Sequence, residues 1–283
     1  MTRLTVPKTY KLFIGGAFPR SESGRTYPVQ SRRGAFIANA AQASRKDVRD
    51  AVSAALSAGS GWANATAYNR GHVLYRVAEL MEGHRGQFVD EIIEQTGVKK
   101  AEAAAEVDQA IDDWVWYAGW CDKYAQVTGN ANPVAGPYFN ISVPEPVGVV
   151  GVVAPQHSAL ASIVSVLAPA LVAGNTVVAI ASERHPLSAI SLAEVLATSD
   201  VPAGVVNVLT GQAAELAPQL AGHPDVRALD LAGTEELDWV ELQVQAADTL
   251  TRVLPPSDSV QAGLHRITAL TELKTVWHPK AVL

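Results

Sequence analysis

The sequence predicts an α/β fold built around a parallel β-sheet, and three observations between Glu145 and Glu183 lead to it. Residues 147–153 form a β-branched apolar run that is too short for a membrane span and suits a strand buried on both faces. Residues 162–172 repeat apolar side chains at helical spacing, and Gly174 supplies a stop. Residues 176–180 give a second strand. Strand, helix and strand make a parallel crossover, the core of a nucleotide-binding type of sheet.

The composition describes a mildly acidic globular protein. Its 283 residues are 48% hydrophobic and 18% charged, with a formal net charge of -6, and they suffice for one large domain or two smaller ones. This balance does not favour a nucleic-acid partner. The N-terminus lacks the apolar segment of a signal peptide and no run approaches about 20 apolar residues, so we expect a cytoplasmic protein without a membrane segment. A single cysteine, Cys121, excludes an intramolecular disulfide.

The N-terminal third is predicted to form a β-hairpin edge followed by helices. Turn signals such as Gly15–Gly16 separate short extended pieces over residues 10–43. Ser44, followed three residues later by Asp47, is a near capping box that opens a helix, and the segment from Gly59 to Gly61 is expected to end it. Three more helices are expected before residue 125, the last of them long and carrying Cys121 on its apolar face.

Strands and helices alternate through the second half. Residues 138–143 alternate like a strand that prolines at 144 and 146 should break. After residue 180 we expect helices at 186–198, 213–221 and 234–250 and strands at 204–210, 226–232 and 252–254. Residues 255–265 look like a loop, and residues 271–277 alternate like a strand.

These motifs, taken in order, resemble the aldehyde dehydrogenase family. SGRTYPV, YRVAELME, EPVGVVGVVAP, LAPALVAGNTVV and PAGVVNVLTG match it over roughly residues 10–238. The resemblance implies the N-terminal half of that family, in which helices and edge strands surround a Rossmann-like parallel five-stranded sheet. We therefore assign residues 1–137 and 148–254 to a cofactor-binding-type domain.

The closing segment resembles the family at a different place. ALTELKTVWHP is similar to the C-terminal strand that builds a small β oligomerisation subdomain with the equivalent of YFNISV, so we assign residues 138–147 and 266–283 to oligomerisation strands. The catalytic domain that would lie between is missing, and residues 255–265 are a linker in its place. Residues 241–265 contain neither the family's glutamate base nor its nucleophilic cysteine. We therefore predict no catalytic residue.

Other candidate groups have structural interpretations. Cys121 lies far from the family's nucleophile loop and is interpreted as a small apolar core residue. His157 stands where the family places its oxyanion-binding asparagine, and we treat it as a relaxed position. The seven histidines show no pair at i, i+4 spacing, so no metal site is expected.

Several positions at which the resemblance implies cofactor-binding residues carry other residues in this sequence. Ile180 replaces a ribose-binding lysine, a loss of about 1–3 kcal/mol, although Glu183 could still accept from ribose hydroxyls. The turn after the fourth strand keeps Gly233 and Thr234, the latter a good N-cap, but its last glycine is replaced by Asp238. With the acids at 235 and 236, this residue places three carboxylates where pyrophosphate would bind. No cofactor is expected and NAD is possible; Glu183, Gly233 and Thr234 are residual cofactor-binding candidates, with a scaffold role favoured.

Three hypotheses for function remain. The leading one is a catalytically inactive subunit that assembles with a complete, active NAD(P)-dependent aldehyde dehydrogenase, as a structural or regulatory partner. The contact would use the strands from Tyr138 to Val143 and from Thr271 to Trp277, since unpaired sheet edges are normally covered. The alternative is a residual NAD(P)-binding subunit of an oxidoreductase complex acting on aldehydes. The third is a truncated gene product without a role.

Overall fold

The computed structural model describes residues 6–234, 236–257 and 261–280. Its centre is a five-stranded sheet of β6 (Val149–Val153), β7 (Thr176–Ile180), β8 (Val206–Leu209), β9 (Val226–Asp230) and β10 (Arg252–Leu254). The strand order is β10-β9-β6-β7-β8, and every pairing is parallel. The predicted Rossmann-like α/β sheet is therefore confirmed, including its fifth strand.

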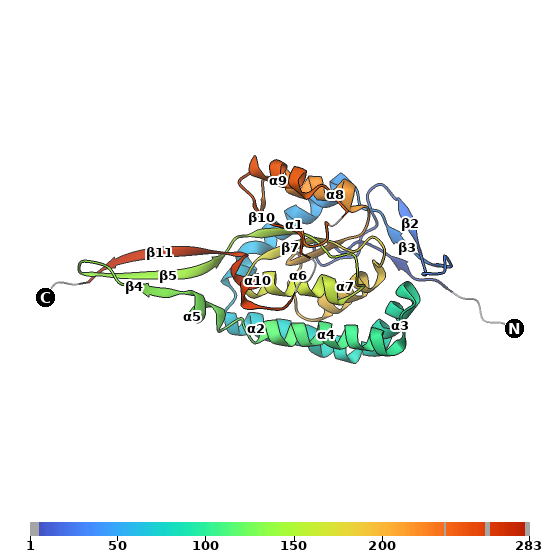
Figure 1. The fold of residues 1–283 in the computed structure, drawn as a ribbon, viewed down its shortest axis with the longest axis horizontal. Helices are drawn as coiled ribbons and strands as arrows, with labels where there is room; N and C mark the ends of the chain where they lie inside the picture. Colours follow the sequence, from blue (N-terminus) through green and yellow to red (C-terminus); the bar gives the residue numbers. More distant parts are fainter. Residues whose placement is uncertain (1–5, 235, 258–260, 281–283) are drawn as a thin grey trace.

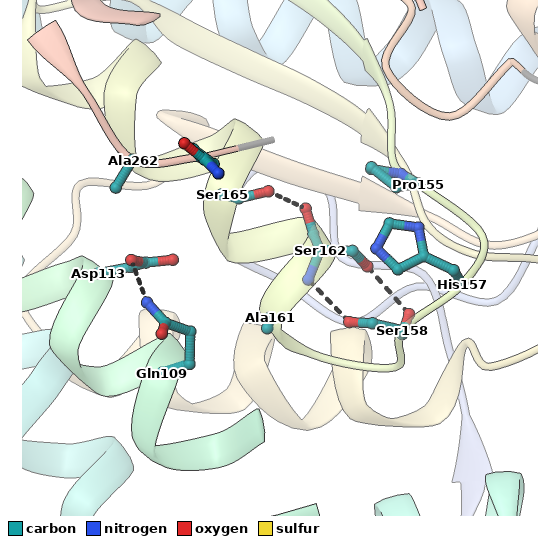
Figure 2. A pocket seen from close by; sticks show the side chains of 10 residues that line it. Gln109, Asp113, Pro155, His157, Ser158, Ala161, Ser162, Ser165 and Ala262 are labelled. Carbon is teal, nitrogen blue, oxygen red and sulfur yellow. Dashed lines mark hydrogen bonds between the residues drawn. The ribbon is translucent and has the colours of Figure 1, made fainter. Parts of the chain in front are cut away.

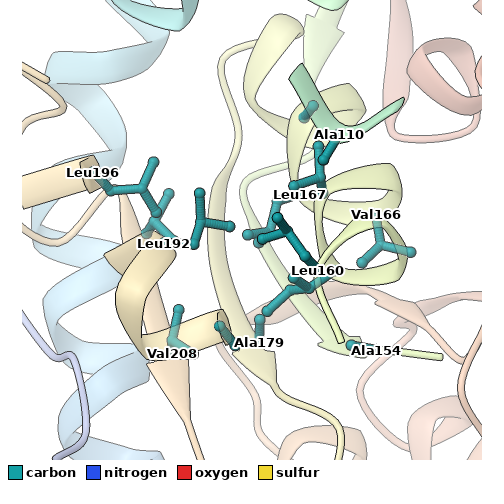
Figure 3. Packing of buried hydrophobic residues seen from close by; sticks show 14 of the residues in the cluster. Ala110, Ala154, Leu160, Val166, Leu167, Ala179, Leu192, Leu196 and Val208 are labelled. Carbon is teal, nitrogen blue, oxygen red and sulfur yellow. The ribbon is translucent and has the colours of Figure 1, made fainter. Parts of the chain in front are cut away.

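Helices cover both faces of this sheet (Figure 1). The helices α6 (Ala161–Val172) and α7 (Leu187–Thr198) pack on one face, and α8 (Ala213–Ala221) packs on the other with α1 (Arg45–Asn64). Beyond α8 lies α9 (Trp239–Ala247). All five residues of β6 and of β7 are buried, as the apolar runs predict for strands covered on both sides. Figure 3 shows leucine, valine and alanine side chains filling the layer next to α6.

The N-terminal region supplies an edge sheet and a further helical layer. Its sheet has the order β1-β3-β2, formed by β1 (Thr9–Tyr10), β2 (Thr26–Gln30) and β3 (Phe36–Ala41). Three helices then pack beneath α6 and α7, namely α2 (Ala67–Gly83), α3 (Arg85–Thr96) and α4 (Lys100–Ala118). The short α5 (Tyr124–Thr128) follows α4 and contacts residues 138–146 instead. No helix among the described residues has the length and apolarity needed to cross a membrane.

The predicted start of α1 is confirmed, and its predicted end is wrong. Ser44 and Asp47 form a complete capping box, in which each side chain accepts a hydrogen bond from the other residue's backbone N–H. The helix then runs through Gly59 and Gly61 to Asn64. Trp62 explains the continuation, because it is buried in the core and its indole N–H donates to the carbonyl oxygen of Leu171 at 3.2 Å. Tertiary packing here overrides the poor helix propensity of glycine.

A three-stranded sheet projects from the body at the end opposite the N-terminus (Figure 1). It comprises β4 (Asn130–Asn132), β5 (Tyr138–Pro146) and β11 (Thr271–Pro279) in the order β11-β5-β4, and we call it the blade. The two outer strands pair antiparallel with β5, from Thr271↔Pro146 to Pro279↔Tyr138 in the case of β11. The expected break at the prolines of β5 is wrong, since pairing with β11 continues through both of them.

A short helix that the sequence does not predict joins the blade to the body. This helix, α10 (Leu264–Thr268), occupies the end of the expected linker and the first residues assigned to the closing strand. Ile267 and Leu270 are fully buried, so this segment belongs to the core of the body.

Candidate functional site

The candidate site lies where the carboxyl ends of β6, β7 and β9 meet, the usual position for ligands on a parallel sheet. Glu183 follows β7, and its backbone N–H donates to the side-chain oxygen of Gln156, which follows β6, at 2.8 Å. The Glu183 carboxylate accepts a hydrogen bond from the backbone N–H of Ala213, the first residue of α8. A carboxylate from another segment therefore satisfies the N-terminus of α8, which its own N-cap Gln212 leaves uncapped.

The turn after β9 is held tightly against β6. Gly233 donates its backbone N–H to the carbonyl oxygen of Val153 at 2.9 Å, and a Cβ on Gly233 would lie 1.9 Å from the carbonyl oxygen of Ala154. Only glycine fits there. Thr234 is fully buried and donates its hydroxyl to the carbonyl oxygen of Leu231 at 2.8 Å. Gly233 and Thr234 thus form a structural turn at the sheet edge.

The expected N-cap role of Thr234 is wrong. The helix α9 begins at Trp239, five residues later than predicted, and its N-cap is Asp238. The Asp238 carboxylate accepts from the backbone N–H groups of Val240 and Glu241, both at 3.1 Å. Residue 235 lies outside the described residues, so its predicted contribution to the negative charge of this turn stays a prediction.

A further carboxylate, which the sequence analysis missed, caps α6. Glu106 of α4 accepts hydrogen bonds through one oxygen from the Ser158 hydroxyl at 2.9 Å and from the backbone N–H groups of residues 159, 160 and 161 at 2.9, 2.7 and 3.3 Å. Its sequence position in the middle of a long helix gives no signal, because the contact depends on how α4 crosses α6. The N-termini of α6, α8 and α9 therefore each receive a carboxylate of the chain itself.

The surroundings of Glu183 contain a second feature that the sequence analysis missed. A cavity of about 560 Å³ is lined by Glu183, Arg184, His185 and Tyr27 among others. Burial and the charge of Glu183 raise the pKa of Tyr27. Arg184, which follows β7, forms an exposed ion pair with Glu236, which lies in the segment after β9. An exposed pair of this kind contributes at most about 1 kcal/mol.

The thiol lies in the turn after α4, so its expected place on the apolar face of that helix is wrong. Cys121 follows α4 and is 1% exposed within the hydrophobic core. Its Sγ donates to the carbonyl oxygen of Tyr117 at 3.7 Å, and burial raises its pKa to about 12. A buried thiol with this pKa is not a nucleophile at neutral pH, so the interpretation as a core residue is confirmed.

The remaining predicted positions carry no reactive arrangement. His157 is exposed at the start of the loop before α6. Within the described ranges, no group of three histidine, cysteine, aspartate or glutamate side chains could hold a metal ion.

One buried ion pair joins the closing segment to the sheet edge. Asp230, the last residue of β9, is fully buried, and its carboxylate accepts from the guanidinium of Arg266 in α10. Burial raises the pKa of Asp230, and the charge of Arg266 opposes that shift. The pairing brings together residues that are 36 positions apart. Neither residue was singled out from the sequence.

Comparisons with known proteins agree with this architecture. The model of the aldehyde dehydrogenase family matches residues 19–254. Cytosolic 10-formyltetrahydrofolate dehydrogenase of Mus musculus is 36% identical over 241 residues, which are 83% of this chain and 27% of the mouse protein. Aldehyde dehydrogenase, cytosolic 1, of Elephantulus edwardii is 31% identical over 260 residues, 89% of this chain and 51% of that protein.

Solved structures give the same result. HpcC from Thermus thermophilus superposes with a TM-score of 0.81 at 32% identity, covering 87% of this chain and 47% of its own. An NAD+ complex of aldehyde dehydrogenase from Bacillus cereus gives 0.80 at 28% identity, covering 87% of this chain and 50% of its own. The chain therefore spans at most about half the length of these relatives, 27% to 51%. By profile, identity and fold, the chain belongs to the aldehyde dehydrogenase family and corresponds to its N-terminal half.

Proposed function

We propose that the chain is a catalytically inactive member of the aldehyde dehydrogenase family that assembles with a complete, active NAD(P)-dependent aldehyde dehydrogenase as a structural or regulatory partner. Its two parts would be the cofactor-type body, residues 1–137 and 148–254, and the blade strands within 138–147 and 266–283. Assembly would take place in the cytoplasm.

The proposal that the chain is inactive by itself is supported by the lack of the two groups that aldehyde oxidation needs. Aldehyde oxidation by a member of this family requires a thiolate nucleophile and a base that activates water. The one cysteine of the sequence is the buried Cys121, and residues 241–265, which stand where the catalytic domain would be, contain no cysteine and no glutamate base motif. The chain therefore depends on another subunit for any turnover.

The carboxyl ends of the sheet strands, where a cofactor would bind, support the same conclusion, because the polar groups there do not fit a dinucleotide well. The backbone N–H of Ala213 is already used by Glu183, and Asp238 fills the N-terminus of α9. A pyrophosphate placed there would meet carboxylates; two unit charges 4 Å apart repel by about 4 kcal/mol at an effective dielectric constant of 20. Ile180, in the position of the family's lysine, is fully buried and offers no donor.

The exposed blade is the single observation that carries the proposed assembly. Seven large apolar side chains on β5 and β11 are 40% to 61% exposed, namely Tyr138, Phe139, Ile141, Val143, Leu273, Val276 and Trp277. The outer edge of β11 has no strand partner within the described residues. Long apolar edge strands of this kind are aggregation-prone unless another chain covers them.

Co-expression tests this assignment. A tagged chain is expressed with a complete aldehyde dehydrogenase from the same host, purified, and analysed by size-exclusion chromatography with mass measurement. A mixed complex is expected, and Val276→Lys on the blade should abolish it. Val244→Lys is the matched control, because this valine on α9 is also exposed, 65% against 47%, but lies outside the blade. A stable monomer beside its host's aldehyde dehydrogenases would reject the proposal.

A second candidate function is binding of NAD(P) within an oxidoreductase complex that acts on aldehydes. The observation that favours it is Glu183, which is only partly buried and uses one carboxylate oxygen on Ala213, while the other oxygen accepts no hydrogen bond from the described residues. That oxygen could accept from ribose hydroxyls. Calorimetric titration with NAD decides between the candidates: sub-millimolar binding that Glu183→Ala weakens supports this function, and no heat at millimolar NAD rejects it.

A further inference from the structure

The charges of this chain are divided unevenly between its first 50 residues and the rest. Residues 1–50 contain ten lysines and arginines and three acids, a formal charge of +7, whereas residues 51–283 contain 12 and 25, a charge of -13. Of the nine cations that the structure describes in the first segment, two form ion pairs with described residues, namely Lys8 with Glu194 and Lys46 with Asp50. Such an asymmetry points to contact with an anionic partner.

The hairpin of β2 and β3 places two of the unpaired cations at its outermost point. Arg32 and Arg33 are the central residues of a tight turn, in which the backbone N–H of Gly34 donates to the carbonyl oxygen of Ser31 at 2.8 Å. Gly34 adopts a φ of 78°, and the N–H of Ser31 donates to the carbonyl oxygen of Ala35 at 2.8 Å to close the turn. Both arginines are exposed. The fold therefore presents two guanidinium groups to water at the end of a hydrogen-bonded hairpin.

Two lysines lie beside this turn. Arg32 packs against the end of α3, since a Cβ on Gly97 would lie 3.4 Å from the Cβ of Arg32. Shortly after Gly97, the exposed Lys99 and Lys100 begin α4, with Lys99 as an N-cap whose side chain makes no capping hydrogen bond. The start of a helix disfavours cations, because its free N–H groups carry partial positive charge. An anion beside these lysines would relieve that repulsion.

Phe36 adds an apolar ring to the same end of the hairpin. It begins β3 opposite Gln30, the last residue of β2, and is 57% exposed. It is the only exposed aromatic side chain among the described residues 6–50. Aromatic rings with neighbouring lysines and arginines are typical of surfaces that lie at the headgroup level of a membrane. We call Arg32, Arg33, Phe36, Lys99 and Lys100 the basic tip.

The acidic residues of the chain do not cancel the charge of the basic tip. Glu94 and Glu102 are near it in sequence, and its four cations outnumber them. Asp113, which lines the cavity beside His157 (Figure 2), lies 13 residues beyond the start of α4. That separation is about 20 Å along a helix, whereas salt screens charges over about 8 Å under physiological conditions. The negative net charge of the whole chain therefore permits contact between the basic tip and an anionic surface.

We propose that the basic tip docks this chain on the surface of an anionic phospholipid membrane, with its arginines and lysines against the lipid headgroups and the ring of Phe36 between them. A membrane fits better than a nucleic acid, because single strands are bound along grooves with several stacking rings, and this tip has one. The strands β2 and β3 lie at the end of the molecule opposite the blade (Figure 1). Docking therefore leaves the blade free, and the inference does not depend on the proposed assembly.

Co-sedimentation of the full chain with lipid vesicles tests this proposal. The wild-type chain should pellet with vesicles made of equal parts phosphatidylserine and phosphatidylcholine, and it should remain in solution with phosphatidylcholine alone. Arg33→Glu should lower the partition coefficient at least about fivefold, because it replaces an attractive charge by a repulsive one. Arg227→Glu is the matched control, since Arg227 in β9 is also exposed, forms no ion pair with a described residue and lies outside the basic tip. It should bind like the wild type.

A second pair of variants tests the aromatic ring. Phe36→Ala should weaken binding about threefold or more, and Tyr75→Ala, which removes a ring on α2 that is 51% exposed, should not. No binding to the anionic vesicles, equal binding to neutral vesicles, or equal losses in the two arginine variants would overturn the proposal. Binding of a single-stranded RNA oligonucleotide without binding of vesicles would overturn it as well, and would assign the basic tip to a nucleic acid.

Discussion

Replacing Arg266 by methionine should strongly destabilise the chain, because it leaves the carboxylate of Asp230 buried without its cation. The side chain of Asp230 is 0% exposed and that of Arg266 is 10% exposed, so water cannot replace the lost partner. Removing one member of a buried ion pair costs about 3–5 kcal/mol. That is a large part of the roughly 5–15 kcal/mol by which folded domains are stable.

Urea unfolding followed by circular dichroism measures this cost. We expect Arg266→Met to lower the free energy of unfolding by about 3–5 kcal/mol, and the double variant Asp230→Leu with Arg266→Met to recover most of the loss, since apolar side chains can replace a buried pair at little cost. The single variant should also become more stable as the pH falls from 7 to 5. Without its cation Asp230 keeps a proton in the folded state that the unfolded chain releases, so stability is lost as the pH rises. A loss below about 1 kcal/mol, or a double variant as weak as the single one, would refute the assignment of a buried pair.

Three further predictions concern single contacts. Gly233→Ala should lower the free energy of unfolding by about 3 kcal/mol or prevent folding, because its Cβ would overlap the carbonyl oxygen of Ala154. Gly59→Ala in the open interior of α1 should instead stabilise the chain by about 0.5–1 kcal/mol, and thermal melting compares the two variants. Glu106→Ala should cost about 2 kcal/mol in urea unfolding, and a change within error would mean that α6 does not need this cap. Burial raises the pKa of Glu91 in α3, so the stability that this carboxyl contributes should be lost as the pH rises above its unfolded-state pKa of 4.5, and Glu91→Gln should lack this dependence; a difference between the two proteins that stays constant over this rise would contradict it.

The parallel sheet was predictable because its signal is local and strong. Runs such as those at 149–153 and 176–180 are long enough for a strand, too short for a helix, and separated by one helix-length segment. The capping box of Ser44 and Asp47 was readable for the same reason. The end of α1 was not, since the glycines at 59 and 61 favour a stop and only the contact of Trp62 with α6 keeps the helix going.

The place of the candidate residues in the fold was predictable, but their contacts were less so. The sequence pointed to Glu183, Gly233 and Thr234 at the sheet edge, where the structure places them. It gave no indication that Glu183 caps α8, because that depends on the spacing of two loops 30 residues apart. Glu106 and the pair of Asp230 with Arg266 were missed for a related reason. Their partners are distant in sequence, and neither a motif nor a period marks such tertiary contacts.

The exposed blade ties the fold to the proposed function. Residues 271–279 are tied to β5 along their whole length and leave apolar side chains facing water, which is costly for a chain that remains alone. Arg266 and the buried α10 hold the base of this blade against the body. This preformed geometry would lower the entropy that the proposed assembly must overcome.

Native mass spectrometry of the chain purified with a complete aldehyde dehydrogenase from the same host tests the central claim most directly. The account predicts a species containing both chains in a fixed ratio, which the blade variant Val276→Lys dissociates and the control Val244→Lys leaves intact. A chain that is recovered only as a monomer or only with copies of itself, while the full-length enzyme runs separately, would contradict it.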